Sequence, residues 1–113
     1  MKVLLCSENE IWTAEIRRDL QRFGHTIVLA HSEAEALRCV RTEWLECVVI
    51  DRDEMGLAPL HALRSRPWSE NVPAIVLQDR ADQPLFETYA AGADMVLEKP
   101  FDPSELHAFF NRR

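Results

Sequence analysis

The chain has 113 residues, of which 47% are hydrophobic and 28% charged, and its formal net charge is −6. This composition predicts one globular domain over residues 1–113 with a single hydrophobic core, and it excludes extensive disorder. The net negative charge, with no basic run, gives the domain no electrostatic basis for binding nucleic acid or an anionic membrane.

The first apolar segment, Val3 to Cys6, is too short for a signal peptide or a membrane span, so we expect a cytoplasmic protein. The cysteines show no CxxC or Cys/His ligand spacing and are expected to be buried free thiols: Cys6, Cys39 and Cys47. No ligand role is assigned to the four scattered histidines, His25, His31, His61 and His107.

In the first half of the chain, Lys2 to Cys6 and Thr26 to Leu29 predict two strands. Between them, apolar residues recur at helical spacing until Gly24, a residue suited to ending a helix: Trp12, Ile16, Leu20 and Phe23. Ser32 and Glu35 then have the spacing of a capping box, which predicts a helix to about Arg41 that buries Ala36, Leu37 and Val40.

A third strand is predicted by the β-branched run that begins at Cys47 and stops at Asp51. Such a short apolar run is typical of a strand buried on both faces of a parallel sheet. Asp51 would lie at the carboxyl end of this strand, where open parallel sheets bind ligands. Two interpretations remain open for it: a functional carboxylate, or a cap for the segment that follows.

The second half continues the alternation. Pro59 suits the first turn of a helix with Leu60 and Leu63 buried and Pro67 as its stop. The remaining predicted elements are a strand from Pro73 to Leu77, a helix from about Pro84 to Ala91 ended by Gly92, a strand from Asp94 to Leu97, and a helix that opens with Asp102-Pro103-Ser104-Glu105 and buries Leu106, Phe109 and Phe110.

Five strands alternating with five helices predict an α/β fold, a doubly wound parallel sheet of the flavodoxin-like type with strand order 2-1-3-4-5. This order gathers Glu8, Asp51 and Lys99 at the carboxyl edge of the sheet. Neighbouring carboxylates favour a shared proton or a hard cation such as Mg²⁺, and an aspartate can form a phosphoryl adduct. Lys99, one of only two lysines, would add a compact positive charge.

Four segments together resemble the receiver domain of two-component response regulators (CheY-like), in order and over the whole chain: Lys2 to Glu8, Val48 to Asp51, Pro73 to Leu77, and Gly92-Ala93-Asp94 through Lys99-Pro100-Phe101. The resemblance implies that Asp51 accepts a phosphoryl group from a histidine kinase or phosphotransfer protein. It also implies that Glu8, Asp51 and the backbone carbonyl of Asp53 bind Mg²⁺, that Lys99 pairs with the phosphoryl group, and that the Lys99-Pro100 bond is cis.

Near the predicted pocket, the chain departs from the family's pattern at three positions. The family usually has two acids after the first strand, whereas here Ser7 precedes Glu8, which weakens metal binding in principle. Where the family has Ser or Thr at the end of the fourth strand, Gln78 offers an amide hydrogen bond from a longer side chain. The following residue, normally small, is Asp79, which adds bulk and negative charge at the pocket mouth.

Further along the expected route to the surface, Val96 replaces the aromatic residue that the family uses as a switch. Met55 and Pro59 stand where the family commonly has Pro and Gly, so the loop after Asp51 is expected to differ in shape. These changes predict an atypical receiver.

Two mechanisms follow from the resemblance. In one, Asp51 is phosphorylated and switches an interaction surface on the last helices and strand; in the other, the domain is a pseudo-receiver that binds a partner without phosphorylation. An enzyme or nucleotide binder of the same fold is disfavoured because no P-loop or GxGxxG turn is present. Beyond its own phosphorylation and dephosphorylation we expect no enzymatic activity.

Expected partners are a kinase or phosphotransfer protein and a downstream output domain or protein, and the last predicted helix ends close enough to Arg113 for a longer natural chain. Leu85 and Tyr89 are expected to lie in the core, with a homodimer face as the alternative. Trp12 is a candidate fluorescence probe for metal binding.

Overall fold

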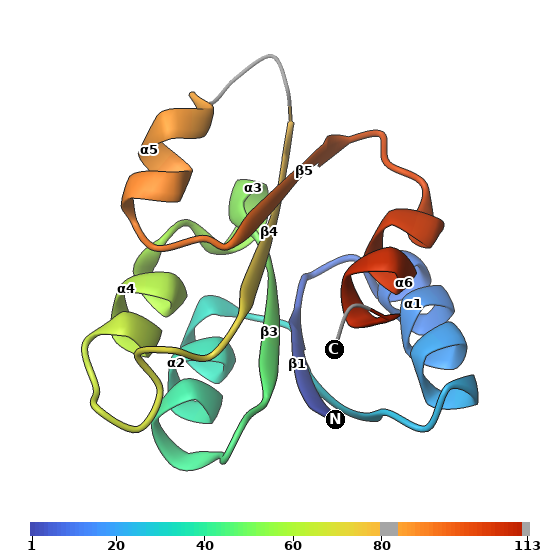
Figure 1. Cartoon of the computed structure of the whole chain (residues 1–113), viewed down its shortest axis with the longest axis horizontal. Coiled ribbons are helices and arrows are strands. Elements are labelled where there is room, and N and C mark those ends of the chain that lie inside the picture. The colour runs from blue at the N-terminus through green and yellow to red at the C-terminus, as the bar shows by residue number, and fades with distance from the viewer. Residues whose placement is uncertain (80–83, 112–113) are drawn as a thin grey trace.

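Five parallel strands form one sheet in the computed structural model, which describes residues 1–79 and 84–111 (Figure 1). The strands are β1 (Lys2–Cys6), β2 (Thr26–Ala30), β3 (Cys47–Asp51), β4 (Ala74–Asp79) and β5 (Met95–Lys99). Their order is β2-β1-β3-β4-β5, and every neighbouring pair is parallel. The predicted fold class and strand order are therefore confirmed.

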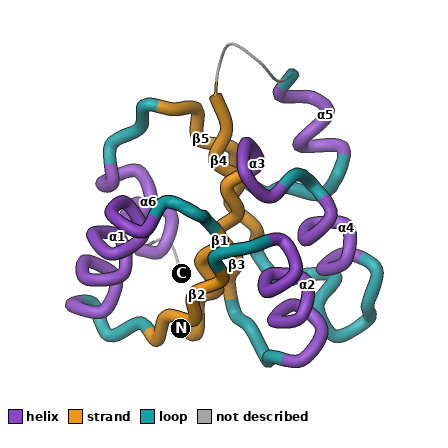
Figure 2. The backbone as a smooth tube through the Cα atoms, turned by 180° about the vertical axis from the view of Figure 1, so that it is seen from behind, coloured by secondary structure: helices purple, strands orange, loops and turns teal. Residues whose placement is uncertain are grey.

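The helices cover both faces of this sheet. They are α1 (Glu10–Arg22), α2 (Glu33–Thr42), α3 (Arg52–Met55), α4 (Ala58–Arg64), α5 (Leu85–Ala90) and α6 (Pro103–Asn111). Figures 1 and 2 show α1 and α6 on one face and the other four on the opposite face. The short helix α3 was not predicted. The bounds of β1 and β3 are as predicted, and those of the other three strands differ from the predicted ones by at most two residues.

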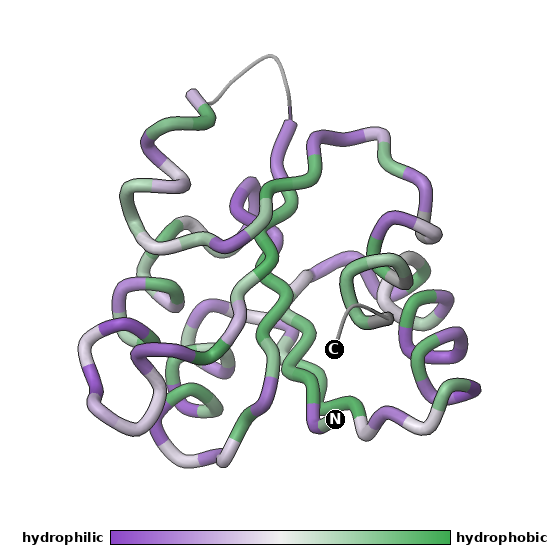
Figure 3. Tube along the Cα trace, in the orientation of Figure 1, coloured by the Kyte–Doolittle hydropathy of each residue, from purple (hydrophilic) through white to green (hydrophobic). Residues whose placement is uncertain are grey.

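The alternating side chains of the central strands build a separate core on each face, so the strands are the most hydrophobic part of the chain in Figure 3. On one face, Leu4, Val48 and Val76 pack in a cluster with Val40 of α2 and Leu63 of α4. The cluster on the other face includes Leu5, Val49, Ile75, Leu20, Leu106, Phe109 and Phe110. Burial on both faces explains why the strand sequences are continuous apolar runs.

The predicted N-terminal caps are present. The hydroxyl of Ser32 accepts a hydrogen bond from the Glu35 backbone N–H at 3.1 Å, while the Glu35 carboxylate accepts one from the backbone N–H of His31 at 3.0 Å. Asp102 similarly accepts from the Ser104 backbone N–H at 2.9 Å. These side chains satisfy donors that the first turn of a helix leaves without a partner.

Arg64 explains the Gly92-Ala93-Asp94 motif. Its guanidinium donates to the carbonyl of Gly92 at 2.9 Å, to the carbonyl of Val72 at 2.6 Å and to the carboxylate of Asp94 at 2.9 Å. A Cβ atom at position 92 would lie 2.8 Å from the Arg64 side chain, and φ there is +115°. Gly92 is thus required both by its backbone conformation and by the close approach of Arg64.

Two predicted core assignments are wrong. Leu37 is only partly buried, whereas Ala36 and Val40 of the same helix are buried as predicted. Leu85 and Tyr89 are 41% and 47% exposed, because the short helix α5 buries Thr88 instead. The side chain of Trp12 lies outside the described part of the structure, so its use as a probe stays a prediction.

Cys6, Cys39 and Cys47 are buried free thiols, as predicted. Among residues 1–79 and 84–111, no helix has both the length and the apolar character that a bilayer crossing requires.

Candidate functional site

The register of the sheet brings the ends of four strands, β1, β3, β4 and β5, to one edge. Cys6 pairs with Ile50, so the connection after β1 begins beside Asp51, the last residue of β3. Asp51 pairs with Leu77 of β4, and Asp79 pairs with Lys99 at the end of β5. The predicted meeting of these connections at the carboxyl edge is confirmed by this pairing.

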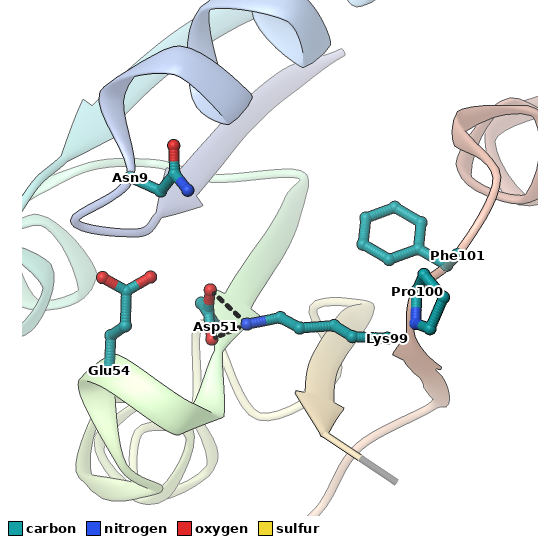
Figure 4. Close-up of a pocket in the computed structure, with 6 residues that line it drawn as sticks. All are labelled: Asn9, Asp51, Glu54, Lys99, Pro100 and Phe101. Carbon is teal, nitrogen blue, oxygen red and sulfur yellow. Dashed lines mark hydrogen bonds and ion pairs between the residues drawn. The ribbon is translucent and has the colours of Figure 1, made fainter.

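Asp51 and Lys99 form the centre of the site. The Lys99 Nζ donates to both carboxylate oxygens of Asp51 at 2.8 Å, and it lies 3.0 Å from Asp53 Oδ2. Figure 4 shows the extended Lys99 side chain reaching Asp51 from β5, which is separated from β3 by β4 in the sheet. Asp51 is only 3% exposed, so this ammonium neutralises a carboxylate that water hardly reaches.

A cavity of about 290 Å³ opens at this ion pair, and its charged lining comes from Asp51, Lys99 and Glu54. Asn9, Pro100 and Phe101 complete the lining (Figure 4). The Lys99-Pro100 peptide bond is cis, as the resemblance implied.

Asp51 caps a helix and also lines the cavity. Its Oδ1 accepts a hydrogen bond from the Asp53 backbone N–H at 3.2 Å, so the side chain caps the short helix α3. The same oxygen accepts from Lys99 at the cavity. Capping therefore fixes the rotamer of the carboxylate without removing it from the pocket.

Ser7 connects two carboxylates. Its hydroxyl lies 2.9 Å from Glu54 Oε1 and 3.4 Å from Asp51 Oδ2, and it is fully buried. The other oxygen of Glu54 accepts a hydrogen bond from the Glu8 backbone N–H at 3.1 Å. Glu54 is thus held against the connection that follows β1, on the opposite side of Asp51 from the β4 strand.

Burial in this pocket raises the pKa of Asp51 from 3.8 to about 6. Burial is the largest cause; the hydrogen bonds from Lys99 oppose it, and the neighbouring Glu54 carboxylate adds to it. Burial also lowers the pKa of Lys99, but its hydrogen bonds to Asp51 and Asp53 outweigh burial, so the net shift is upward.

The other expected site residues are placed as follows. The Glu8 side chain is exposed and outside the cavity lining, although its backbone holds Glu54. The Asp53 side chain pairs with Lys99 and accepts a hydrogen bond from the Asp79 backbone N–H at 3.2 Å. Asp79 itself is exposed.

Sequence reasoning did not select Glu54 as a site residue. The signal available in the sequence was an acid three residues after Asp51, one helical turn away.

Gln78 is fully buried and bonded toward α5 rather than included in the cavity lining. Its amide oxygen accepts a hydrogen bond from Thr88 Oγ1 at 2.6 Å. The guanidinium of Arg52, the residue after Asp51, donates to the same Thr88 oxygen and to Glu87 Oε1 at 2.7 Å. We call Arg52, Gln78, Glu87 and Thr88 the α5 network, because they join the ends of β3 and β4 to α5.

The remaining departures from the family pattern also have defined positions. The backbone N–H of Val96 donates to the hydroxyl of Tyr89 at 3.3 Å, so the aromatic residue next to this strand comes from α5. Met55 is completely buried, and Pro59 lies in the first turn of α4, as predicted. Gly56, with φ of +65°, separates the two helices.

The donor set of the pocket fits a hard cation. No cluster of three or more His, Cys, Asp or Glu side chains arranged for metal binding occurs in residues 1–79 and 84–111. Mg²⁺, however, usually keeps several water molecules and takes one or two carboxylates. The oxygens of Asp51 and Glu54 that converge on Ser7 meet this smaller requirement.

A family model described as the response regulator receiver domain matches residues 3–111. The chain belongs to this family. Receiver domains are signalling modules of two-component systems and are not conventional enzymes.

Relatives of this receiver include the response regulator MprA of Mycobacterium ulcerans, which is 31% identical over 112 residues, covering 96% of this chain and 47% of MprA. The chain thus spans about half the length of such curated relatives.

Two solved structures share the receiver fold. The chemotaxis response regulator CheY4 of Vibrio cholerae has a TM-score of 0.88 and 24% identity, covering 98% of this chain and 96% of that chain. The receiver domain of the sensor histidine kinase PA1611 from Pseudomonas aeruginosa has a TM-score of 0.85 and 24% identity, covering 98% and 94%. That structure contains a magnesium ion coordinated in its active-site cleft.

Proposed function

We propose that this receiver accepts a phosphoryl group on Asp51 from a histidine kinase or phosphotransfer protein and thereby switches a protein-interaction surface around α5, β5 and α6. The observation that carries the proposal is the buried Asp51 carboxylate at the cavity, bonded through both oxygens to Lys99 at 2.8 Å. An aspartate so placed meets the geometric needs of a nucleophile with a cation beside it.

In the proposed transfer, a carboxylate oxygen of Asp51 forms a bond to phosphorus while the bond between phosphorus and the donor nitrogen breaks. Lys99, already at this carboxylate, pairs with the negative charge of the transferred group. Gln78 acts as a positioning residue, because its amide oxygen is bonded to Thr88.

Mg²⁺ would neutralise charge on the phosphoryl oxygens during transfer. We propose that Asp51, Glu8 and the backbone carbonyl of Asp53 hold it, as the resemblance implies. The magnesium in the PA1611 receiver supports a cation at the equivalent edge of this fold. The exposed Glu8 side chain lies on the connection whose backbone already contacts Glu54 in the pocket.

The test is phosphorylation by a small phosphodonor. The wild-type chain is incubated with acetyl phosphate and Mg²⁺, and intact-mass spectrometry counts the phosphoryl groups. We expect one acid-stable, base-labile group on the wild type and none on Asp51→Asn, with loss of labelling when EDTA is added. Equal labelling of wild type and Asp51→Asn would contradict the assignment.

A pseudo-receiver is the second candidate, and the α5 network favours it. Gln78 is fully buried and bonded to Thr88, so the end of β4 is tied to α5 before any phosphoryl group is present. In this alternative, a partner binds the exposed apolar residues of α5, Leu85, Phe86 and Tyr89, in either state of Asp51. The same residues are the candidate homodimer face. An unlabelled wild-type chain in the acetyl phosphate experiment would favour this alternative.

A further inference from the structure

Glu54 places a carboxylate beside Ser7, which stands at a position where the family usually has an acid. It is one of two carboxylates that line the cavity, and it comes from α3 rather than from the connection after β1. Both of its oxygens are bonded to that connection, one to the hydroxyl of Ser7 at 2.9 Å and one to the backbone of Glu8 at 3.1 Å. The carboxylate is therefore fixed in place from two directions.

The Ser7 hydroxyl cannot donate to both of the carboxylates that it faces. The Ser7 hydroxyl has one proton, yet it lies within hydrogen-bond distance of both Glu54 Oε1 and Asp51 Oδ2. The backbone N–H of Asn9 donates to the same Ser7 oxygen at 3.2 Å, so it uses a lone pair and adds no proton for the carboxylates. Lys99 also donates to Asp51 Oδ2 at 2.8 Å, but its single positive charge faces the carboxylates of Asp51, Asp53 and Glu54. A divalent cation between Asp51 and Glu54 would balance this excess of negative charge.

Ser7 has a hydroxyl and no carboxylate, so it cannot replace the missing acid. It stands at the first of the two positions where the family pattern has acids, and its side chain is fully buried beneath Glu54 and Asp51. The Glu54 carboxylate, which comes from α3 after the neighbouring strand β3, contacts the Ser7 hydroxyl. Glu54 thus brings a negative charge to the hydroxyl of the residue that stands at an acid position of the family pattern.

We propose that Glu54 supplies a further carboxylate to the Mg²⁺ site, beside Asp51 and Glu8, in place of the acid absent at position 7. This inference rests on the proposed function, since it assumes that the pocket binds a divalent cation. Glu54 acts on the cation directly or through one of its water molecules, and it has no role in the bond to phosphorus.

The test is a Mg²⁺ titration followed by isothermal calorimetry, with competition by Mn²⁺ read by electron paramagnetic resonance. Glu54→Gln keeps an oxygen for the Glu8 N–H but removes the charge, and we expect its Mg²⁺ affinity to fall about 10-fold or more. The double variant Ser7→Asp/Glu54→Gln returns an acid to position 7 and is expected to regain most of the affinity. Glu15→Gln, on the exposed face of α1, is the matched control and leaves binding unchanged.

Each outcome has a distinct meaning. Wild-type binding with unchanged affinity in Glu54→Gln overturns this inference alone, and so does a double variant that binds no better than Glu54→Gln. A wild-type chain that binds no Mg²⁺ overturns the proposed phosphorylation chemistry as well. Thermal unfolding of each variant in EDTA shows whether it is folded, and the double variant keeps the test decisive if Glu54→Gln unfolds.

Discussion

The polar groups on the two sides of Asp51, toward β1 and toward α5, find their hydrogen-bond partners in different ways. On the β1 side, carboxylate oxygens of Asp51 and Glu54 converge on the single hydroxyl of Ser7. In the α5 network, Thr88 donates to Gln78 and accepts from Arg52, so each of these hydrogen bonds has a matching donor and acceptor. The proposed cation would therefore add a positive partner on the β1 side, whereas the hydrogen bonds of the α5 network do not involve it.

The largest expected effect comes from removing the positive charge of the pocket. Lys99→Met is expected to lower the rate of Asp51 phosphorylation by acetyl phosphate on the order of 100-fold, because one preorganised charge partner is lost. The rate is followed by intact-mass spectrometry. Lys2→Met removes the other lysine, which pairs with Glu43 at the opposite edge of the sheet, and it is expected to leave the rate unchanged. Equal rates for both variants would remove Lys99 from the mechanism.

The burial of Asp51, together with the neighbouring Glu54 carboxylate, predicts a specific pH dependence of stability. The pKa of Asp51 rises from 3.8 to about 6 on folding, so the folded state holds the proton more tightly than the unfolded chain. This contribution is fully present below about pH 4 and is lost as the pH rises through about 6, with a total of at most about 3 kcal/mol.

Urea denaturation in EDTA between pH 4 and 7 measures this effect. Asp51→Asn cannot ionise, so its free energy of unfolding is expected to lack this loss and to exceed the wild-type value at pH 7. Parallel pH profiles for the two proteins would show that Asp51 ionises in the folded chain as easily as in the unfolded one.

The α5 network is expected to contribute stability without affecting the cation. Thr88→Val keeps the shape of the side chain but leaves the buried Gln78 oxygen without this donor, which costs about 1–3 kcal/mol. Denaturation gives the free energy, and calorimetry is expected to show unchanged Mg²⁺ affinity. The matched control, Thr42→Val on the exposed end of α2, costs less than about 0.5 kcal/mol. A loss of Mg²⁺ affinity in Thr88→Val would show that the two sides of Asp51 are not separate.

The sequence was sufficient for the sheet and for the convergence of Asp51 and Lys99, because buried strands show as apolar runs and the strand order determines which ends meet. It was insufficient for Glu54. Its role depends on α3 turning directly after Asp51, and a four-residue helix leaves no periodic pattern to detect.

The sequence also gave no indication that the Gln78 side chain would bond toward α5, because its partner, Thr88, lies ten residues along the chain. Spacing gave no indication that Thr88, rather than Leu85 or Tyr89, would be the buried residue of that helix. Thr88 is buried although it is polar, because its hydroxyl bonds to both Gln78 and Arg52.

The most direct test of the central claim is the binding of beryllofluoride with Mg²⁺, a mimic of the phosphoryl group, followed by amide NMR spectra. The account predicts chemical-shift changes centred on Asp51, Ser7 and Lys99 in the wild type, and none in Asp51→Asn. A wild-type spectrum that does not change at saturating beryllofluoride and Mg²⁺ would contradict phosphorylation at Asp51.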